Sequence, residues 1–186
     1  MKAIPRSGWI SHGIALQEVE SIADHSFSTC ALALLLADLE VERGKRVNIE
    51  RVLRLALLHD MSETLTFDIS KEYLQYLGQR GEAIKAELEH AAWKHIADGL
   101  HEPNLRRGYT RLQKEFDAEQ TFESRIVHAA DGLDILLQVL AYRKRGYPES
   151  LLADLWDATG VKLRSLGVPS ARKVQKMLVQ AKRPHA

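Results

Sequence analysis

The sequence predicts an all-α protein that folds as a single domain. Apolar side chains recur at helical spacing along most of the 186 residues, and no stretch of useful length alternates between apolar and polar side chains. Neither an internal repeat nor a low-complexity linker divides the chain, which is long enough to bury a core without disulfides or a structural metal. We therefore expect one helical bundle over residues 1–186, with its core at about 4–165 and a C-terminal helix at about 169–183.

Residues that start and stop helices divide this chain into elements. After an irregular segment at 1–20, Ser21 is a suitable N-cap for a helix to about residue 43, and Asp24 acts as the acidic partner of a capping box. Asn48 caps the next helix, which ends at the pair His59-Asp60. The elements expected after it are a loop at 64–70, a short helix at 71–77, helices at about 82–97, 105–119, 121–145, 149–165 and 169–183, and a frayed tail at 182–186.

Composition and charge are those of an ordinary soluble chain. The formal net charge is +1, from 26 basic and 25 acidic residues, which disfavours a nucleic-acid polymer as the main partner. The single cysteine, Cys30, excludes an internal disulfide and suits a reducing compartment. The longest wholly apolar run, at 30–37, is too short to span a bilayer, and the N-terminus lacks a signal pattern. These features predict a cytoplasmic protein without a membrane partner.

Four polar residues stand on otherwise apolar helical surfaces. They are, in chain order, His25, the pair His59-Asp60, and Asp131. An unpaired charge on such a surface is costly, and a shared cation would compensate the two carboxylates while drawing in the two imidazoles. A set of two nitrogens and two oxygens suits one divalent ion such as Mn²⁺, Co²⁺, Fe²⁺ or Mg²⁺, and it leaves coordination positions for water and a phosphate oxygen.

The order His, His-Asp, Asp resembles that of the HD-domain metal-dependent phosphohydrolases. Further segments are similar to the 5′-deoxynucleotidase branch, which includes the "HD domain containing 2" proteins. These segments are Arg6-Ser7-Gly8-Trp9, Glu20-Ser21-Ile22-Ala23-Asp24-His25-Ser26, His59-Asp60-Met61-Ser62-Glu63 and Ala129-Ala130-Asp131. The resemblance extends over about residues 4–160 and implies an HD-domain helical bundle.

The resemblance also implies a role for each residue of the motifs. The metal ligands would be His25, His59, Asp60 and Asp131. Glu63 and Asp68 would be catalytic carboxylates, and Arg6 and Trp9 would contact the nucleotide. The implied activity is metal-dependent removal of the 5′-phosphate from deoxynucleoside monophosphates. Such chemistry needs a cation for the phosphate dianion and a proton for the leaving oxygen.

Two other functions fit the same motifs. One is an HD hydrolase that acts on a nucleoside triphosphate or a phosphodiester, for which more basic residues would be expected around the motifs. The other is a non-catalytic protein that binds the metal or a nucleotide, which would not need Glu63 and Asp68. We also expect a homodimer, from the resemblance and from Trp93 and Trp156 on the later helices, which look exposed in the sequence pattern.

Overall fold

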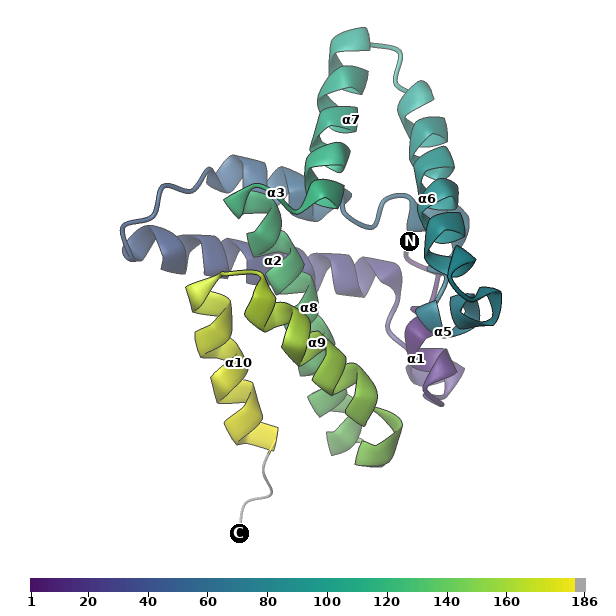
Figure 1. Ribbon diagram of the computed structural model, residues 1–186, viewed down its shortest axis with the longest axis vertical. Helices are drawn as coiled ribbons and strands as arrows, with labels where there is room; N and C mark the ends of the chain where they lie inside the picture. Colours follow the sequence, from purple (N-terminus) through teal and green to yellow (C-terminus); the bar gives the residue numbers. More distant parts are fainter. Residues whose placement is uncertain (183–186) are drawn as a thin grey trace. The chain divides into compact units, whose positions relative to one another are not determined.

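The computed structural model describes the backbone of residues 1–182 and all of their side chains except that of residue 71 (Figure 1). Every regular element in this part of the chain is a helix, and the one β-contact is an isolated antiparallel bridge between Pro5 and Ser21. The helices are α1 (Ser7–Ser11), η1 (Leu16–Glu18), α2 (Ile22–Glu42), α3 (Ile49–Leu58), α4 (Glu63–Thr66), α5 (Lys71–Leu74), η2 (Gln75–Leu77), α6 (Arg80–Asp98), α7 (Pro103–Ala118), α8 (Phe122–Lys144), η3 (Glu149–Leu151), α9 (Ala153–Ser165) and α10 (Pro169–Lys182). The all-α prediction is confirmed.

The predicted capping residues do start their helices. Ser21 Oγ accepts from the Asp24 amide at 3.2 Å, and Asp24 Oδ2 accepts from the Ser21 amide at 3.0 Å, so the capping box of α2 is complete. The side chain of Asn48 accepts from the Arg51 amide at 3.0 Å at the start of α3.

Four sequence expectations are wrong. The opening segment contains α1 and η1, and the expected loop at 64–70 begins with α4. The helix expected from about residue 105 begins at Pro103, because a proline at the first helical position loses no hydrogen bond. Trp93 and Trp156 are 5% and 6% exposed, so neither offers an apolar surface to a partner. The expected fraying of the tail beyond residue 182 lies outside the described residues.

The chain forms two compact units. The first unit consists of Met1–Ser26 and Leu57–Lys114. In it, α4 and α5 pack against α6, and α1 packs against α5. The approach of α5 to α6 requires a glycine, because a Cβ at Gly81 would lie 2.3 Å from the carbonyl oxygen of Leu74.

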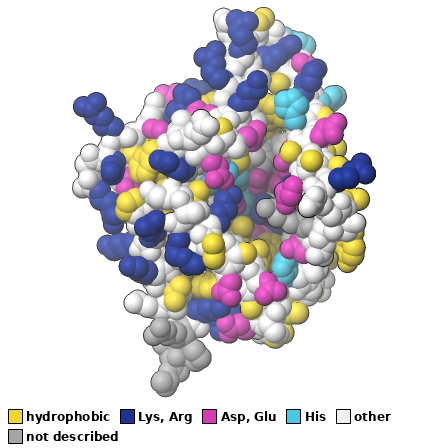
Figure 2. Space-filling view, in the orientation of Figure 1, with side chains coloured by type: hydrophobic (Ala, Val, Ile, Leu, Met, Phe, Trp, Pro, Cys, Tyr) yellow, Lys and Arg dark blue, Asp and Glu magenta, His cyan; other side chains and the backbone are white. Residues whose placement is uncertain are grey.

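The second unit consists of Phe27–Ala56 and the chain from Glu115 onward. Here α8 packs against both α9 and α10, and its buried side chains include Ile126, Leu133 and Leu136. Lys and Arg side chains gather over the region of α9 and α10 in the space-filling view (Figure 2). α10 is amphipathic, with Ala171 and Gln175 buried and Arg172, Lys173 and Lys176 exposed to solvent.

The helix α2 is long and apolar enough to cross a membrane by length and composition. The eight-residue apolar run considered in the sequence is thus part of a longer apolar helix. The core helix of a soluble protein meets the same test, and α2 carries the fully buried carboxyl group of Glu40. Glu40 Oε1 accepts from the Ser170 amide at the start of α10 at 2.6 Å, a protein contact that suits a core position.

Candidate metal centre

Three of the predicted ligands meet in the first unit. His25, fully buried, lies in the first turn of α2, and the chain leaves α3 at Leu58 directly before His59 and Asp60. His25 Nε2 lies 3.4 Å from His59 Nε2 and 3.4 Å from Asp60 Oδ2, and His59 Nε2 lies 3.2 Å from the same oxygen. Two imidazole nitrogens and a carboxylate oxygen therefore converge on one point.

The geometry of these three atoms fits a divalent ion. Neighbouring ligand atoms on an ion with bonds of about 2.1 Å lie roughly 3 Å apart. Two imidazole nitrogens that face each other at 3.4 Å need a proton or a cation between them, because their lone pairs repel. A mixed nitrogen and oxygen donor set is also the one predicted from the sequence.

A tight turn, not a continuous helix, delivers the His59-Asp60 pair. The Met61 amide donates to the Leu58 carbonyl at 3.0 Å, and the Glu63 amide donates to the Asp60 carbonyl at 3.1 Å. These are three-residue spacings, so α3 ends at Leu58 and α4 begins at Glu63. The turn allows Asp60 and Glu63 to approach the same cation, Arg6.

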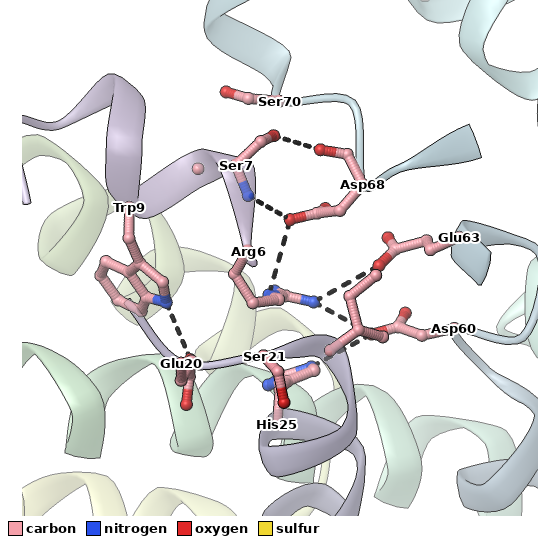
Figure 3. Close-up of polar contacts among 12 residues, drawn as sticks. Arg6, Ser7, Trp9, Glu20, Ser21, His25, Asp60, Glu63, Asp68 and Ser70 are labelled. Carbon is pink, nitrogen blue, oxygen red and sulfur yellow. Dashed lines mark hydrogen bonds and ion pairs between the residues drawn. The ribbon is translucent and has the colours of Figure 1, made fainter. Parts of the chain in front are cut away.

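Arg6 lies among three carboxylates (Figure 3). One of its terminal nitrogens is 2.9 Å from Asp60 Oδ2 and 3.8 Å from Glu63 Oε2, and its Nε is 3.8 Å from Asp68 Oδ2. The side chain is only 15% exposed, so these interactions are poorly screened by solvent. A guanidinium held in this way stands where a phosphate could bind beside the metal ligands.

Two carboxyl groups in this cluster are shifted in opposite directions. Burial opposes the ionisation of Asp60, but the charges of His59, Arg6 and His25 and a hydrogen bond from His59 outweigh it, so the pKa of Asp60 lies well below its ordinary value. Burial, with the nearby charge of Asp60, raises the pKa of Glu63 to about 9. Neighbouring carboxyl groups with separated pKa values are typical of acid–base sites. Asp60 is ready to bind a cation, and Glu63 holds a proton at neutral pH.

Asp68 is fixed by a strained turn and by Ser7. Phe67 and Asp68 have φ angles of 62° and 47°, in the left-handed region that side chains other than glycine rarely occupy. The Ser7 amide donates to Asp68 Oδ2 at 2.8 Å, and the Ser7 hydroxyl donates to the Asp68 carbonyl. These contacts hold the Asp68 carboxylate against the start of α1, beside Arg6.

Trp9 lies on α1 with its ring buried and 3% exposed. Its indole N–H donates to Glu20 Oε1 at 2.8 Å (Figure 3). The polar edge of the indole is thereby already satisfied, so Trp9 can offer a ligand only its apolar surface.

The fourth predicted ligand belongs to the other unit. Asp131 lies on α8, on the second unit, and is half-buried. Its role as a ligand stays a prediction. The first unit therefore assembles His25, His59, Asp60, Arg6, Trp9, Glu63 and Asp68, seven of the eight residues singled out in the sequence.

Sequence reasoning missed three residues of this neighbourhood. Ser7 and Glu20 lie within the motifs that carry the resemblance, but their contacts join segments far apart in sequence. Lys85 on α6 is the third; its charge acts on both Glu63 and Asp68, and its ammonium also lies 3.4 Å from a carboxylate oxygen of Glu89. A single lysine in the second turn of a helix carries no signal of such a role in the sequence.

Comparison with known proteins identifies the family. Residues 1–170 match the HD domain. The chain belongs to the HD-domain family. The predicted resemblance is confirmed.

Several proteins similar to this HD domain are named 5′-deoxynucleotidase. The 5′-deoxynucleotidase HDDC2 of Homo sapiens is 29% identical over 162 residues, which cover 87% of this chain and 72% of that protein. The 5′-deoxynucleotidase hdd1 of Schizosaccharomyces pombe is 28% identical over 148 residues, covering 78% and 68% of the two chains. A solved structure, a conserved hypothetical protein from Pyrococcus furiosus, has a TM-score of 0.79 at 28% identity and covers 96% of this chain and 93% of its own. The branch predicted from the motifs is thus the one whose members are similar to this HD domain.

Proposed function

We propose that this HD domain is a metal-dependent phosphohydrolase that removes the 5′-phosphate of deoxynucleoside monophosphates. The observation that carries the proposal is the convergence of His25, His59 and Asp60 directly beside Arg6 and two further carboxylates. The relatives named 5′-deoxynucleotidase support the substrate class.

His25, His59 and Asp60 would hold one divalent ion, Mn²⁺, Co²⁺, Fe²⁺ or Mg²⁺, with Asp131 as the fourth ligand. A bound ion of this kind polarises a phosphoryl oxygen and lowers the pKa of a bound water to supply the nucleophile. The depressed pKa of Asp60 supports its part, because the carboxylate stays ionised over the whole physiological range.

The chain's own side chains would carry charge and protons around the phosphate. Arg6 balances the negative charge that develops on the phosphoryl oxygens, since its guanidinium can leave one carboxylate and bind a phosphate oxygen instead. Glu63, protonated at neutral pH, can give its proton to the departing 5′ oxygen. Asp68, held by Ser7, keeps Arg6 directed at the site.

Trp9 would read the sugar. Its buried ring, with the N–H already bonded to Glu20, presents an apolar wall that leaves a 2′-hydroxyl without a partner. Exclusion of a hydroxyl by an apolar wall is worth on the order of a hundredfold. Such a pocket favours deoxynucleotides while contacting the phosphate and the sugar, which every nucleotide has whatever its base.

We further propose a cytoplasmic homodimer. Apolar side chains on the first unit that remain exposed support an interface there; they include Phe67 at 65%, Tyr76 at 84% and Leu77 at 48%. Light scattering at tens of micromolar should give twice the chain mass, and a monomer mass would refute the assembly.

The test of the activity is phosphate release from a substrate panel with several metals. We expect dAMP and other deoxynucleoside monophosphates to be hydrolysed, AMP more slowly, and dATP and cyclic nucleotides not at all. Hydrolysis of a triphosphate or a phosphodiester in preference to dAMP would move the function to another HD hydrolase. If no nucleotide is hydrolysed with any metal, the alternative of a non-catalytic protein that binds the metal or a nucleotide would hold.

A further inference from the structure

Trp9 stands on an element that cannot position it alone. The helix α1 has five residues, no side-chain N-cap bond and no acidic residue in its first turn. Helices this short are unstable by themselves, so the orientation of the Trp9 ring must come from contacts outside α1. The indole has one polar atom, its N–H, and a bond to that atom fixes the rotation of the ring.

Glu20 makes that bond from the extended segment before α2. Its Oε1 accepts from the Trp9 indole at 2.8 Å (Figure 3). Hydrogen bonds to a charged acceptor are stronger than those to a neutral one, and this bond is half-buried. Glu20 therefore fixes the orientation of the buried Trp9 ring.

The backbone of the same residue holds Arg6. The Arg6 amide donates to the Glu20 carbonyl at 3.0 Å, and the Ile22 amide donates to the Ile4 carbonyl at 2.9 Å. Together with the bridge between Pro5 and Ser21, these bonds pair the segment before α1 with the segment before α2. Glu20 thus holds the backbone of Arg6 through its carbonyl and the ring of Trp9 through its carboxylate.

We infer that Glu20 is the positioning residue for sugar selection: its carboxylate holds the Trp9 ring in the orientation that excludes a 2′-hydroxyl. This inference rests on the proposed function and adds to it a residue that touches no substrate atom. A rival role is metal binding, because a Glu20 carboxylate oxygen lies within 4.8 Å of a ring nitrogen of His25. If Glu20 positions Trp9, a substitution lowers sugar selectivity and leaves the metal content unchanged. If Glu20 is a metal ligand, the substitution lowers the metal content.

The experiment compares Glu20→Gln, which keeps an acceptor oxygen, with Glu20→Met, which has a similar shape and no acceptor. Glu87→Gln, on an exposed position of α6, is the control for losing a carboxylate. We expect Glu20→Met to lower the dAMP/AMP ratio of kcat/KM by about tenfold. In Glu20→Gln and in Glu87→Gln the same ratio should stay within about twofold of that of the parent protein. The metal content of all variants should be that of the parent protein.

A second readout needs no turnover. The indole N–H signal of Trp9, assigned with Trp9→Phe, should move upfield in Glu20→Met and much less in Glu20→Gln, because only the former loses the acceptor. Should Glu20→Met fail to fold, Glu20→Asp replaces it, since a side chain shorter by one methylene withdraws the carboxylate but keeps the charge.

Each of these measurements either supports or overturns the role of Glu20. An unchanged dAMP/AMP ratio in the folded variant without the acceptor overturns the inference, and so does metal loss in that variant, which would make Glu20 a ligand. An indole signal that does not respond overturns the contact itself. If the parent protein hydrolyses no deoxynucleotide, the proposed function fails, and a shifted indole signal would still show that Glu20 holds Trp9.

Discussion

The proton on Glu63 gives a prediction that can be tested on the metal-free protein. Its folded-state pKa of about 9 lies well above its ordinary value of 4.5. Between these two values the folded protein holds one more proton than the unfolded chain. Stability from this group is therefore fully present below about pH 4.5 and is lost as the pH rises toward 9.

The size of the effect follows from linkage. Well inside that window the free energy of unfolding falls by about 1.4 kcal/mol per pH unit, or roughly 2.7 kcal/mol between pH 6 and pH 8. Glu63 is 7% exposed, so solvent screening takes little from this figure. The variant Glu63→Gln resembles the protonated carboxyl in shape and has no proton to lose.

Urea unfolding at pH 6 and pH 8, on protein freed of metal and checked by elemental analysis, measures the effect. We expect the stability of the parent protein relative to Glu63→Gln to fall by about 2.7 kcal/mol between the two pH values. Titrating groups that do not interact with Glu63 are common to both proteins and cancel in this difference. Parallel pH profiles for the two proteins would show that Glu63 is ionised in the folded state and could not act as the acid.

Three further outcomes are expected. Gly81→Ala should destabilise the protein by about 1–3 kcal/mol, because the added Cβ would meet the Leu74 carbonyl. Gly108→Ala on α7 should stabilise it by about 0.5–1 kcal/mol, because the Cβ there would enter open space. Equal urea midpoints for the two variants would contradict this. Glu40→Leu should cost about 1–3 kcal/mol by orphaning an amide at the start of α10, and Glu40→Gln less, by the same assay; equal costs would refute the capping role. Trp9→Ala should narrow the dAMP/AMP ratio of kcat/KM, and an unchanged ratio would remove Trp9 from sugar reading.

Local chemistry made much of the fold predictable. Ser21 with Asp24 and the Asn48 side chain start α2 and α3 by contacts within three residues, which a sequence displays directly. The short helix expected at 71–77 ends before Gly78, whose φ is 56°. The order of histidines and carboxylates was equally readable, since each stood on an apolar surface.

Long-range contacts explain what was not predictable. The helix α1 has no capping signal of its own and is held by Glu20, eleven residues beyond Trp9, and by Asp68, 61 residues beyond Ser7. The sequence ends the helix at His59-Asp60, but it does not display the successive turns that carry the chain from there to Glu63. Such features depend on tertiary packing, which overrides local propensity.

The central claim is that His25, His59 and Asp60 hold a catalytic metal. The most direct measurement removes the metal with a chelator and follows phosphate release from dAMP as Mn²⁺ or Co²⁺ is restored, for the parent protein and for Asp60→Ala. Activity in the parent protein should disappear with the metal and return in proportion to its occupancy, while Asp60→Ala should neither retain the ion nor hydrolyse dAMP. Full metal occupancy in Asp60→Ala, or undiminished activity in the verified metal-free parent, would contradict it.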